Sequence, residues 1–272
     1  LKRLPRLQRL SALSHVVTAN GLEIESVPVD SLRELVSLRS VGAFSLTTTL
    51  LSSLGLPSSV ELGTIDVENN ARLASFDATA LAEPAVARVT FANNAVLDEI
   101  TLLGDETLES VTVSDMPALA SVVMPEMESI TQLSVQRAGL SALALPATHN
   151  IDSIVVSECP AIETVSLPDA TGGTFTQHLG VEVTECPLLH DLVFTSVEDV
   201  SLDLENLPSL QSLSAFSAIR KVNSQMKIVS SGVSNLSALS GATISGPIDL
   251  EDLPALTTLE GLDGLALALP DE

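Results

Sequence analysis

Large aromatic side chains are almost absent from this sequence of 272 residues. It contains no Trp, no Tyr and only six Phe, although 45% of its residues are hydrophobic. A core without large rings has to be filled by Leu, Val, Ile and Ala, which suit a thin repeated layer better than the wide interior of a globule. The shortage also disfavours a polysaccharide-degrading enzyme, because sugar sites usually contain aromatic platforms.

Basic residues are scarce as well. The chain has 12 Lys and Arg against 35 Asp and Glu, which gives a net charge of −23. Such a surface repels phosphates, so neither nucleic acid nor an anionic membrane is expected as a partner. The charge is uneven, because residues 1–43 contain six Lys or Arg and only four Asp or Glu.

Membrane-spanning runs and a disulfide framework are not visible. No apolar run approaches the roughly 18 residues that cross a bilayer, so we expect no membrane insertion. No secretory signal is visible, but the sequence starts at Leu1 rather than Met, so we expect that a segment upstream was removed or left out. Cys159 and Cys186 are too few for a disulfide scaffold.

What the sequence does contain is a short repeat. Residues 65–76 and 202–213 are both apolar at their first, third, ninth and twelfth positions. The same template fits segments that begin at Val89, Val111, Ile154, Val181 and Ile248, and a form one residue shorter in the turn fits those that begin at Val17, Phe44, Leu133 and Met226. The sequence therefore predicts about eleven repeats of 21–27 residues.

Each repeat has a physical interpretation. Positions one to three alternate as in a half-buried strand, and position seven is often Pro, which fits a corner just after a strand. Positions nine and twelve add a second apolar pair, with Leu119, Leu210 and Leu256 at position nine predicted to be almost fully buried. One repeat cannot bury its own apolar face, so neighbouring repeats must stack. We predict one mainly β domain over residues 1–272, a right-handed parallel β-coil solenoid with one short strand per turn.

The expected strands lie in one parallel sheet, in sequence order. Their predicted ranges are 65–67, 89–91, 111–113, 133–135, 154–156, 181–183 and 202–204.

Two repeats are longer than the others. In the first, residues 31–40 have helical spacing at Leu32, Leu35, Val36 and Leu38, and Gly42 could end that helix. In the second, residues 169–180 are predicted to form an irregular loop. The spacing of the repeats recurs from Ile154, which suggests an old duplication with halves at 17–153 and 154–272.

The first residues allow two interpretations. Residues 4–10 resemble residues 207–213 in their Leu and Pro positions, which indicates part of an earlier repeat. The alternative is a basic amphipathic helix that caps the end of the coil.

Position six carries a resemblance to known families. The long repeats have Asn70, Asn94, Met116, Cys159, Cys186, Leu207 and Leu253 there. Asn or Cys after a Leu-x-Leu strand resembles the leucine-rich repeat, where it faces inward and bonds neighbouring backbones. Residues 253–265 are similar to the receptor L domain, and residues 159–168 to the Treponema-type leucine-rich repeat of bacterial surface proteins. The strands here favour Val and Ile over Leu, and most repeats lack Asn.

The resemblance implies a secreted or surface-displayed binding protein, most plausibly bacterial, and it transfers no catalytic residue. Within it, Cys159 and Cys186 are either buried substitutes for Asn or a disulfide between adjacent coils. Stacked parallel strands, about 4.8 Å apart, would allow that disulfide. Four histidines (His15, His149, His178 and His190) are interpreted as surface residues in or near turns.

Acidic residues alternate on the outward side of several predicted strands. Glu182 and Asp203 fall at the same position of neighbouring repeats, where they form either a solvated acidic face or a pair of Ca²⁺ ligands. Loops on a rigid scaffold often carry function, so we expect the specific contact in residues 169–180. There Phe175 is either free to bind or folded back onto a gap.

These observations predict a non-enzymatic binding or adhesion module, outside the cell or on its surface, that recognises a protein or another surface component. No catalytic, cofactor or metal site is expected. The alternatives are a structural spacer or self-assembling surface element, and a β-helical enzyme that degrades polysaccharide. The candidate ligand contacts are Thr174, Phe175, Gln177, His178, Glu182, Asp203 and Glu205.

Overall fold

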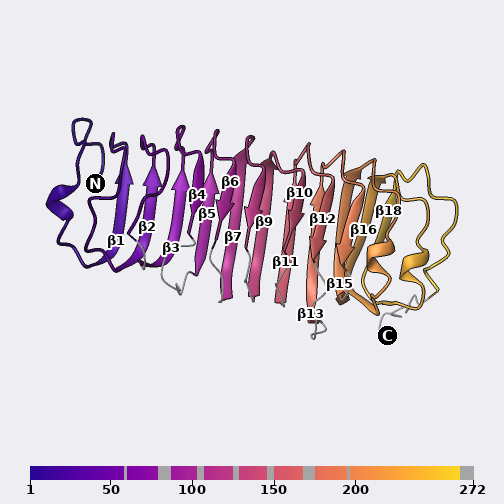
Figure 1. Ribbon diagram of the computed structural model, residues 1–272. Coiled ribbons are helices and arrows are strands. Elements are labelled where there is room, and N and C mark those ends of the chain that lie inside the picture. The colour runs from indigo at the N-terminus through magenta and orange to yellow at the C-terminus, as the bar shows by residue number, and fades with distance from the viewer. Residues whose placement is uncertain are drawn as a thin grey trace. The chain divides into compact units, whose positions relative to one another are not determined.

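The computed structural model describes residues 1–57, 60–78, 87–102, 107–124, 129–145, 150–167, 175–194 and 197–263. The chain forms two compact units, Leu1–Leu140 (unit 1) and Ser141–Glu272 (unit 2). Each unit is a parallel β-solenoid in which successive coils contribute strands to one main parallel sheet (Figure 1). The helical elements among the described residues are short 3-10 turns. None of them is long and apolar enough to cross a membrane.

Unit 1 contains two sheets. The main sheet has the order β1-β2-β3-β5-β7-β9, and the smaller sheet has the order β4-β6-β8. The bounds of the main strands are β1 Thr18–Glu25, β2 Ser40–Thr47, β3 Glu61–Glu68, β5 Arg88–Ala92, β7 Thr107–Met116 and β9 Ser129–Ala138. Those of the smaller sheet are β4 Ser75–Asp77, β6 Glu99–Thr101 and β8 Ser121–Val123, and a 3-10 turn spans η1 Ser11–Leu13.

Unit 2 repeats this arrangement. Its main sheet has the order β11-β13-β15-β16, after which β16 pairs with both β17 and β18, and its smaller sheet has the order β10-β12-β14. The main strands are β11 Asn150–Ser157, β13 Phe175–Thr184, β15 Val197–Leu207, β16 Lys221–Ser231, β17 Thr243–Ile244 and β18 Ile248–Glu251. The smaller sheet contains β10 Ala142–Ala144, β12 Thr164–Leu167 and β14 Asp191–Phe194, and the 3-10 turns are η2 Ser214–Phe216 and η3 Ser237–Leu239.

The predicted strands and their stacking are confirmed inside each unit. In unit 1, Ile65 pairs with Val89, Val89 with Val111, and Val111 with Leu133, all in parallel register. In unit 2, Ile154 pairs with Val181, and Val181 with Leu202. The apolar marker positions therefore stack on one another and fill the core, because strand residues two apart point to the same side.

The prediction of one strand per turn is incomplete. Position twelve lies in a second short strand in the middle coils, as at Phe76 of β4 and Ile100 of β6, both fully buried. Each of these strands alternates a buried residue with more exposed neighbours, which is the pattern of a half-buried strand. Three coils have 3-10 turns instead, at η1, η2 and η3.

The first repeat begins five residues later than predicted. Leu22, not Val17, pairs with Phe44, and Ile24 pairs with Leu46. Ile24 is fully buried, whereas half of the Val17 surface is exposed. Counted from Leu22, this repeat has ordinary length, so the long first spacing that opened the predicted half-duplication pattern is no longer present.

Residues 31–40 do not form the predicted helix. Leu35 and Leu38 each donate a backbone hydrogen bond to the carbonyl three residues earlier, and their side chains are buried with that of Leu32. Val36, which a helix would have placed on the same face, is 60% exposed. The apolar spacing is thus three residues per turn, which produces two successive tight turns.

The predicted irregular loop at residues 169–180 is wrong over residues 175–180, and residues 169–174 lie outside the described residues. Residues 175–180 belong to strand β13, and Leu179 is fully buried opposite Val200 of β15. A deletion of residues 170–179, which would have tested a free loop, would therefore remove a paired strand segment and a core side chain.

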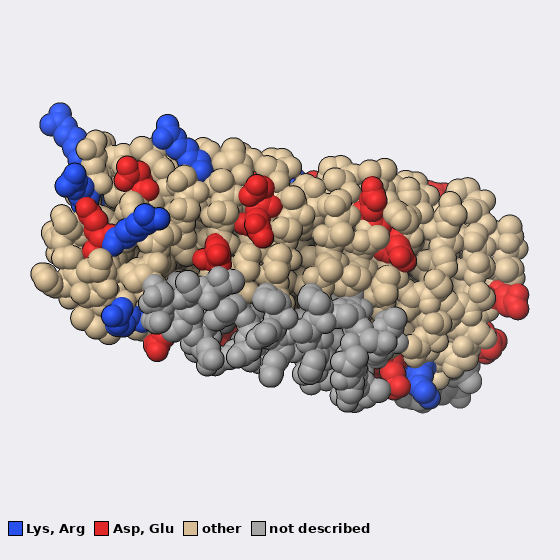
Figure 2. Space-filling model, viewed as in Figure 1, with Lys and Arg blue, Asp and Glu red and all other residues tan. Residues whose placement is uncertain are grey.

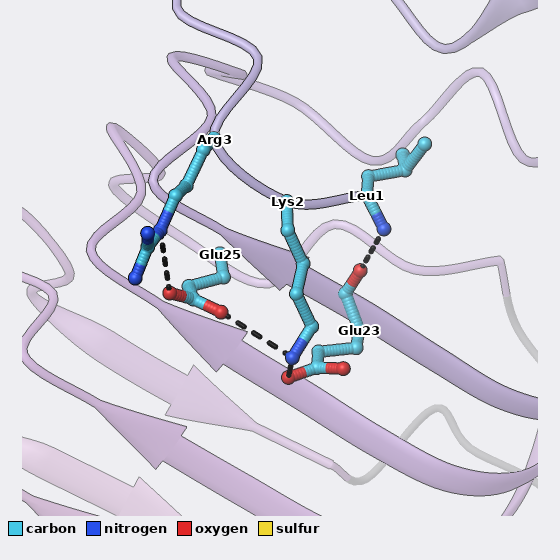
Figure 3. Close-up of polar contacts among 5 residues, drawn as sticks. All are labelled: Leu1, Lys2, Arg3, Glu23 and Glu25. Atoms are coloured by element: carbon cyan, nitrogen blue, oxygen red, sulfur yellow. Dashed lines mark hydrogen bonds and ion pairs between the residues drawn. The ribbon is translucent and has the colours of Figure 1, made fainter.

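The N-terminal residues follow the repeat and not the amphipathic helix. Leu7 donates to the Leu4 carbonyl as Leu210 donates to that of Leu207, and Lys2 forms a parallel bridge with Glu25. The Leu1 ammonium donates to the Glu23 carbonyl at 2.6 Å, and Lys2 makes ion pairs with Glu23 and Glu25 (Figure 3). The basic residues thus lie over the acidic side chains of β1.

In the described coils, a residue with a left-handed backbone either follows the main strand directly or is its next-to-last residue, which the sequence did not suggest. Twelve non-glycine residues at this position five have φ between 49° and 56°. They are Arg3, Ser26, Thr48, Asn69, Asn93, Asp115, Arg137, Glu158, Glu185, Asn206, Ser230 and Asp252. Among residues other than glycine, Asn and Asp tolerate this conformation best. Most of the twelve residues are of other types, so their backbones are locally strained and are held in this conformation by the neighbouring coils.

We expect Gly42→Ala to destabilise unit 1 by about 1–3 kcal/mol. A Cβ atom at Gly42 would lie 2.6 Å from the Asn20 carbonyl oxygen, a backbone atom that cannot move without disturbing β1. Gly21→Ala is the matched control, because its Cβ would meet only the Ala43 oxygen at 3.6 Å. Urea unfolding followed by far-UV circular dichroism compares the two variants. Equal midpoints would contradict the steric argument.

Candidate functional site

A polar hollow of about 260 Å³ opens on the outward face of the main sheet of unit 2. Strands β11, β13, β15 and β16 supply its walls. Its lining consists of Ser153, Gly180, Val181, Glu182, Ser201, Leu202, Asp203 and Gln225. Val181 and Leu202 are buried and contribute the floor, so the groups that a ligand would meet are mainly hydroxyls, carboxylates and an amide.

Gly180 creates the hollow. It pairs with Ser153 on one side and with Ser201 on the other, so three small residues lie side by side across the sheet. A Cβ atom on Gly180 would meet the two seryl oxygens at 3.8 and 3.6 Å, which is ordinary contact. Glycine at this position therefore leaves open space above the sheet, and its backbone is not strained.

The two carboxylates of the hollow are in register. Glu182 pairs with Asp203, as the repeat predicted, and Asp203 pairs with Lys227. The Lys227 ammonium lies 2.6 Å from Glu205 Oε2 and 3.4 Å from Asp203 Oδ1. These carboxylates raise the pKa of Lys227, and the hydrogen bond that Lys227 donates to Glu205 is the largest cause. Lys227 is thus held closer to Glu205 than to the hollow.

A second polar group lies beside the hollow. His178 Nδ1 is 3.0 Å from Asp199 Oδ1, and the other oxygen of Asp199 accepts a hydrogen bond from the Asn223 amide. The imidazole is 39% exposed, so one edge is fixed by Asp199 while part of the ring remains open to solvent. His178 can therefore present a hydrogen-bonding group at a fixed position on the strand face.

Two of the predicted ligand contacts, Glu182 and Asp203, line the hollow. His178 and Glu205 lie on the same face of β13 and β15 outside its lining, and His178 belongs to a strand and not to a turn. Phe175 and Gln177 lie in β13, but their side chains fall outside the described residues, as does Thr174. Thus the alternatives for Phe175 stay open. Of the other histidines, His15 and His190 are exposed, as predicted, and His149 is not described.

Several residues of the site were not predicted. They are Ser153, Asp199, Ser201, Asn223, Gln225 and Lys227. Their signal was available, because residues at equal positions in successive repeats become neighbours across the sheet. Alignment of the repeats by register would have placed Ser201 and Ser153 beside Gly180.

The described residues provide no third His, Cys, Asp or Glu ligand for a Ca²⁺ ion between Glu182 and Asp203. Among the residues that the structure describes, no group of three or more His, Cys, Asp or Glu is arranged to hold a metal ion. Ca²⁺ takes six to eight oxygen ligands, so the Glu182 and Asp203 pair would be a small part of a complete site.

Position six behaves as the leucine-rich-repeat resemblance implied, at least where it is Asn. Asn70 is fully buried, and its amide donates to the carbonyls of Leu46 and Glu68 at 3.0 and 2.8 Å. Its oxygen accepts from the backbone and hydroxyl of Thr49. Asn94 continues the ladder, because its side-chain oxygen accepts a hydrogen bond from the backbone N–H of Asn70 at 2.9 Å.

The two cysteines replace Asn in this ladder and do not form a disulfide. The Cys159 thiol donates to the Ser157 carbonyl, and that of Cys186 to the Thr184 carbonyl, each at 3.3 Å. Asn70 bonds the carbonyl two residues earlier in the same way. The neighbouring Cys159 and burial together raise the pKa of the Cys186 thiol, which keeps it in the protonated, unreactive form.

Unit 1 carries a different acidic pair on its outward face, Asp66 and Glu68 of β3. Burial raises the pKa of Asp66, and the adjacent Glu68 carboxylate raises it further. A raised folded-state pKa means that folding favours the protonated form. The charged Asp66 therefore costs stability above its folded pKa, and this cost disappears as the pH falls below its unfolded value.

We expect Asp66→Asn to raise the melting temperature at pH 7 and to have little effect below pH 3.5, near the unfolded value for Asp. Asp203→Asn is the control at the same repeat position, because Asp203 has Lys227 as an ionic partner and should not gain stability when neutralised. Thermal melts between pH 3 and 8 provide the measurement. An Asp66→Asn benefit that persists at low pH would contradict the electrostatic cause.

Comparison with known proteins yields one weak structural match. No protein-family model matches the chain, and no curated protein matches it. The crystal structure of a TLR13–ssRNA13 complex is similar at 12% sequence identity with a TM-score of 0.23, and the match covers 93% of this chain and 52% of that one. The chain thus spans about half the length of that structure. A likeness this weak transfers no fold, site or ligand to the chain.

Proposed function

We propose that the protein is a non-enzymatic binding module, secreted or displayed at a cell surface, that recognises a protein ligand through the strand face of unit 2. Its closest description is a leucine-rich-repeat-like or receptor L-like solenoid. The observation that carries the proposal is the hollow around Gly180, where Glu182 and Asp203 stand beside small side chains. The Asn ladder at position six supports the assignment to leucine-rich-repeat-like coils.

The chemistry of the hollow favours a basic side chain of the ligand. A volume of about 260 Å³ is small for a whole metabolite but sufficient for the end of one long side chain. Glu182 is exposed, and Asp203 Oδ1 is buried with the Lys227 ammonium 3.4 Å away as its ionic partner. An Arg or Lys that entered beside them would gain charge-assisted hydrogen bonds, with His178 and Gln225 at the rim as further polar contacts.

The strand face is rigid, which favours recognition. Its polar groups stand on strands that are hydrogen-bonded on both sides, so few of them need to be ordered when a partner binds. Aromatic anchors are not among the described side chains of the hollow, so we expect modest affinity that weakens with salt.

Selection of a displayed random-peptide library on the immobilised protein tests this proposal. We expect enrichment of Arg- or Lys-containing peptides whose binding falls at least tenfold in Gly180→Leu, which fills the hollow. Gly21→Leu, on the exposed strand face of unit 1, should retain binding. Selected peptides that bind Gly180→Leu as tightly as the wild type would refute the proposed site.

A further inference from the structure

A polar pocket of about 650 Å³ lies in unit 1, where the coils turn away from the main sheet. Four successive coils contribute to it, namely the N-terminal coil, which forms a bridge with β1, and the coils that follow β1, β2 and β3. Its charged and polar lining consists of Gln8, Arg9, Asp30, Ser31, Glu34 and Arg72. A volume in this range is typical of pockets that hold small ligands.

The charges that line this pocket are balanced in number but are not paired. Among the residues that the structure describes, the side chains of Arg9, Asp30 and Arg72 have no ion-pair or hydrogen-bond partner. All three residues are exposed. Most Lys and Arg visible in Figure 2 lie on the N-terminal repeats, and this pocket is formed by those repeats. Groups of opposite charge thus share one pocket without neutralising one another.

An ion pair between adjacent coils is possible elsewhere in unit 1. Arg137 binds Asp115 of the preceding coil at 2.9 Å, across a coil spacing of about 4.8 Å. Asp30 follows β1, whereas Arg72 follows β3, so their coils are two steps apart, which is about 9.6 Å. The larger separation leaves space for a ligand between their charged groups.

The backbone that carries these groups is held in place by two hydrogen bonds. Ser31 Oγ accepts from the backbone N–H of Arg33 at 3.2 Å, which fixes the start of the tight turns that follow β1. A carboxylate oxygen of Glu34 accepts from the backbone N–H of Leu10, which joins these turns to the N-terminal coil. Leu50 is 41% exposed and adds apolar surface to the lining. The walls are therefore preorganised, which lowers the cost of binding.

The charges are ordered along the stack of coils. Near β1, the carboxylates of Asp30 and Glu34 outnumber the guanidinium of Arg9, whereas the coil after β3 contributes only Arg72 to the charged lining. The pocket thus has a negative end and a positive end. A simple anion or cation would be attracted at one end and repelled at the other. A ligand with separated charges of both signs is complementary to both ends.

The distance between the two ends indicates the size of such a ligand. A free amino acid carries its ammonium and carboxylate on one carbon atom, so it cannot extend across two coil steps. An extended peptide advances about 3.3–3.6 Å per residue, so three residues span about 10 Å. That length matches the separation between the coils of Asp30 and Arg72.

We propose that this pocket binds a short peptide, about three residues long, through its two free ends. The peptide ammonium binds the Asp30 carboxylate, and the peptide carboxylate accepts charge-assisted hydrogen bonds from the Arg72 guanidinium. Gln8 and Arg9 supply donors for the peptide carbonyl groups between the ends. The pocket lies in unit 1, so this proposal does not depend on the strand-face function of unit 2.

Fluorescence anisotropy of the peptide Gly-Trp-Gly tests the proposal on the full chain, which has no Trp or Tyr of its own. We expect saturable binding that becomes at least tenfold weaker when the amino end is acetylated or the carboxyl end is amidated. Free tryptophan should also bind at least tenfold more weakly. Equal affinities of the free and blocked peptides, equal affinity of free tryptophan, or no saturable binding of Gly-Trp-Gly would each overturn the proposal.

Two variants locate the ends of the bound peptide. Asp30→Asn should weaken Gly-Trp-Gly at least fivefold without affecting the acetylated peptide, and Arg72→Gln should weaken it equally without affecting the amidated peptide. Asp98→Asn and Arg88→Gln are matched controls at exposed positions of unit 1 outside the pocket, and both should retain binding. An equal loss in the controls would show that long-range charge governs binding and would overturn the proposal.

Discussion

Asn70→Ala is expected to lower the free energy of unfolding by about 4 kcal/mol. The Asn70 side chain is fully buried and forms hydrogen bonds with Thr49, Leu46 and Glu68 in three directions. Its removal leaves a buried amide, a hydroxyl and two carbonyls without this partner, and each such group costs about 1–3 kcal/mol unless it finds another. The small cavity left by the side chain admits little compensation.

Two variants calibrate this result. Asn94→Ala removes fewer bonds, to the Asn70 amide and the Val67 carbonyl, and should cost about 2–3 kcal/mol. Asn20→Ala, at an exposed position of β1, should change stability by no more than about 0.5 kcal/mol. Urea unfolding followed by far-UV circular dichroism suits a chain without Trp or Tyr. An Asn70→Ala cost below about 1 kcal/mol would mean that the ladder contributes little.

Leu210→Ala is expected to cost about 2–5 kcal/mol. Leu210 and Leu119 at position nine are fully buried, as predicted, so truncation of either removes apolar contacts and leaves a cavity between coils. The equivalent prediction for Leu256 is wrong, because Leu256 is only partly buried. It lies in the last coil that the structure describes, where fewer described residues pack around it.

The series Leu119→Ala, Leu210→Ala and Leu256→Ala therefore has a predicted order. The first two should be similar and large, and the third should cost about 1 kcal/mol or less. The same urea titrations measure all three, with Leu50→Ala as an exposed leucine control. If Leu256→Ala were as destabilising as Leu210→Ala, burial in the described coil would not account for the cost.

The sequence by itself determined the repeat and the strands. Polar and apolar residues alternate over only three positions in each copy, but the copies are numerous, and stacking is the only way in which all of them can bury their apolar faces. The positions of Ile65, Val111 and Leu202 in the sheet were predictable for this reason. The inward-facing Asn70 was implied by the resemblance of position six to the leucine-rich repeat, and its burial requires the backbone partners that it has.

Only the tertiary structure revealed the features that depend on pairing between strands and on local backbone strain. The first repeat could start at Val17 or Leu22 with equally apolar markers, and only pairing with Phe44 selected Leu22. Position five carries Arg, Ser, Thr, Glu, Asn or Asp, so composition could not reveal its left-handed conformation, which the stacked neighbours impose.

The candidate site depended on the tertiary structure for the same reason. Its charged residues are visible in the sequence, but His178 and Asp199 are 21 residues apart and meet only because β13 and β15 pair in one particular register. A shift of one residue would turn each side chain to the opposite face of the sheet. The sequence determined the types of side chain on the outward face, and the hydrogen-bond register between coils determined which of them share a hollow.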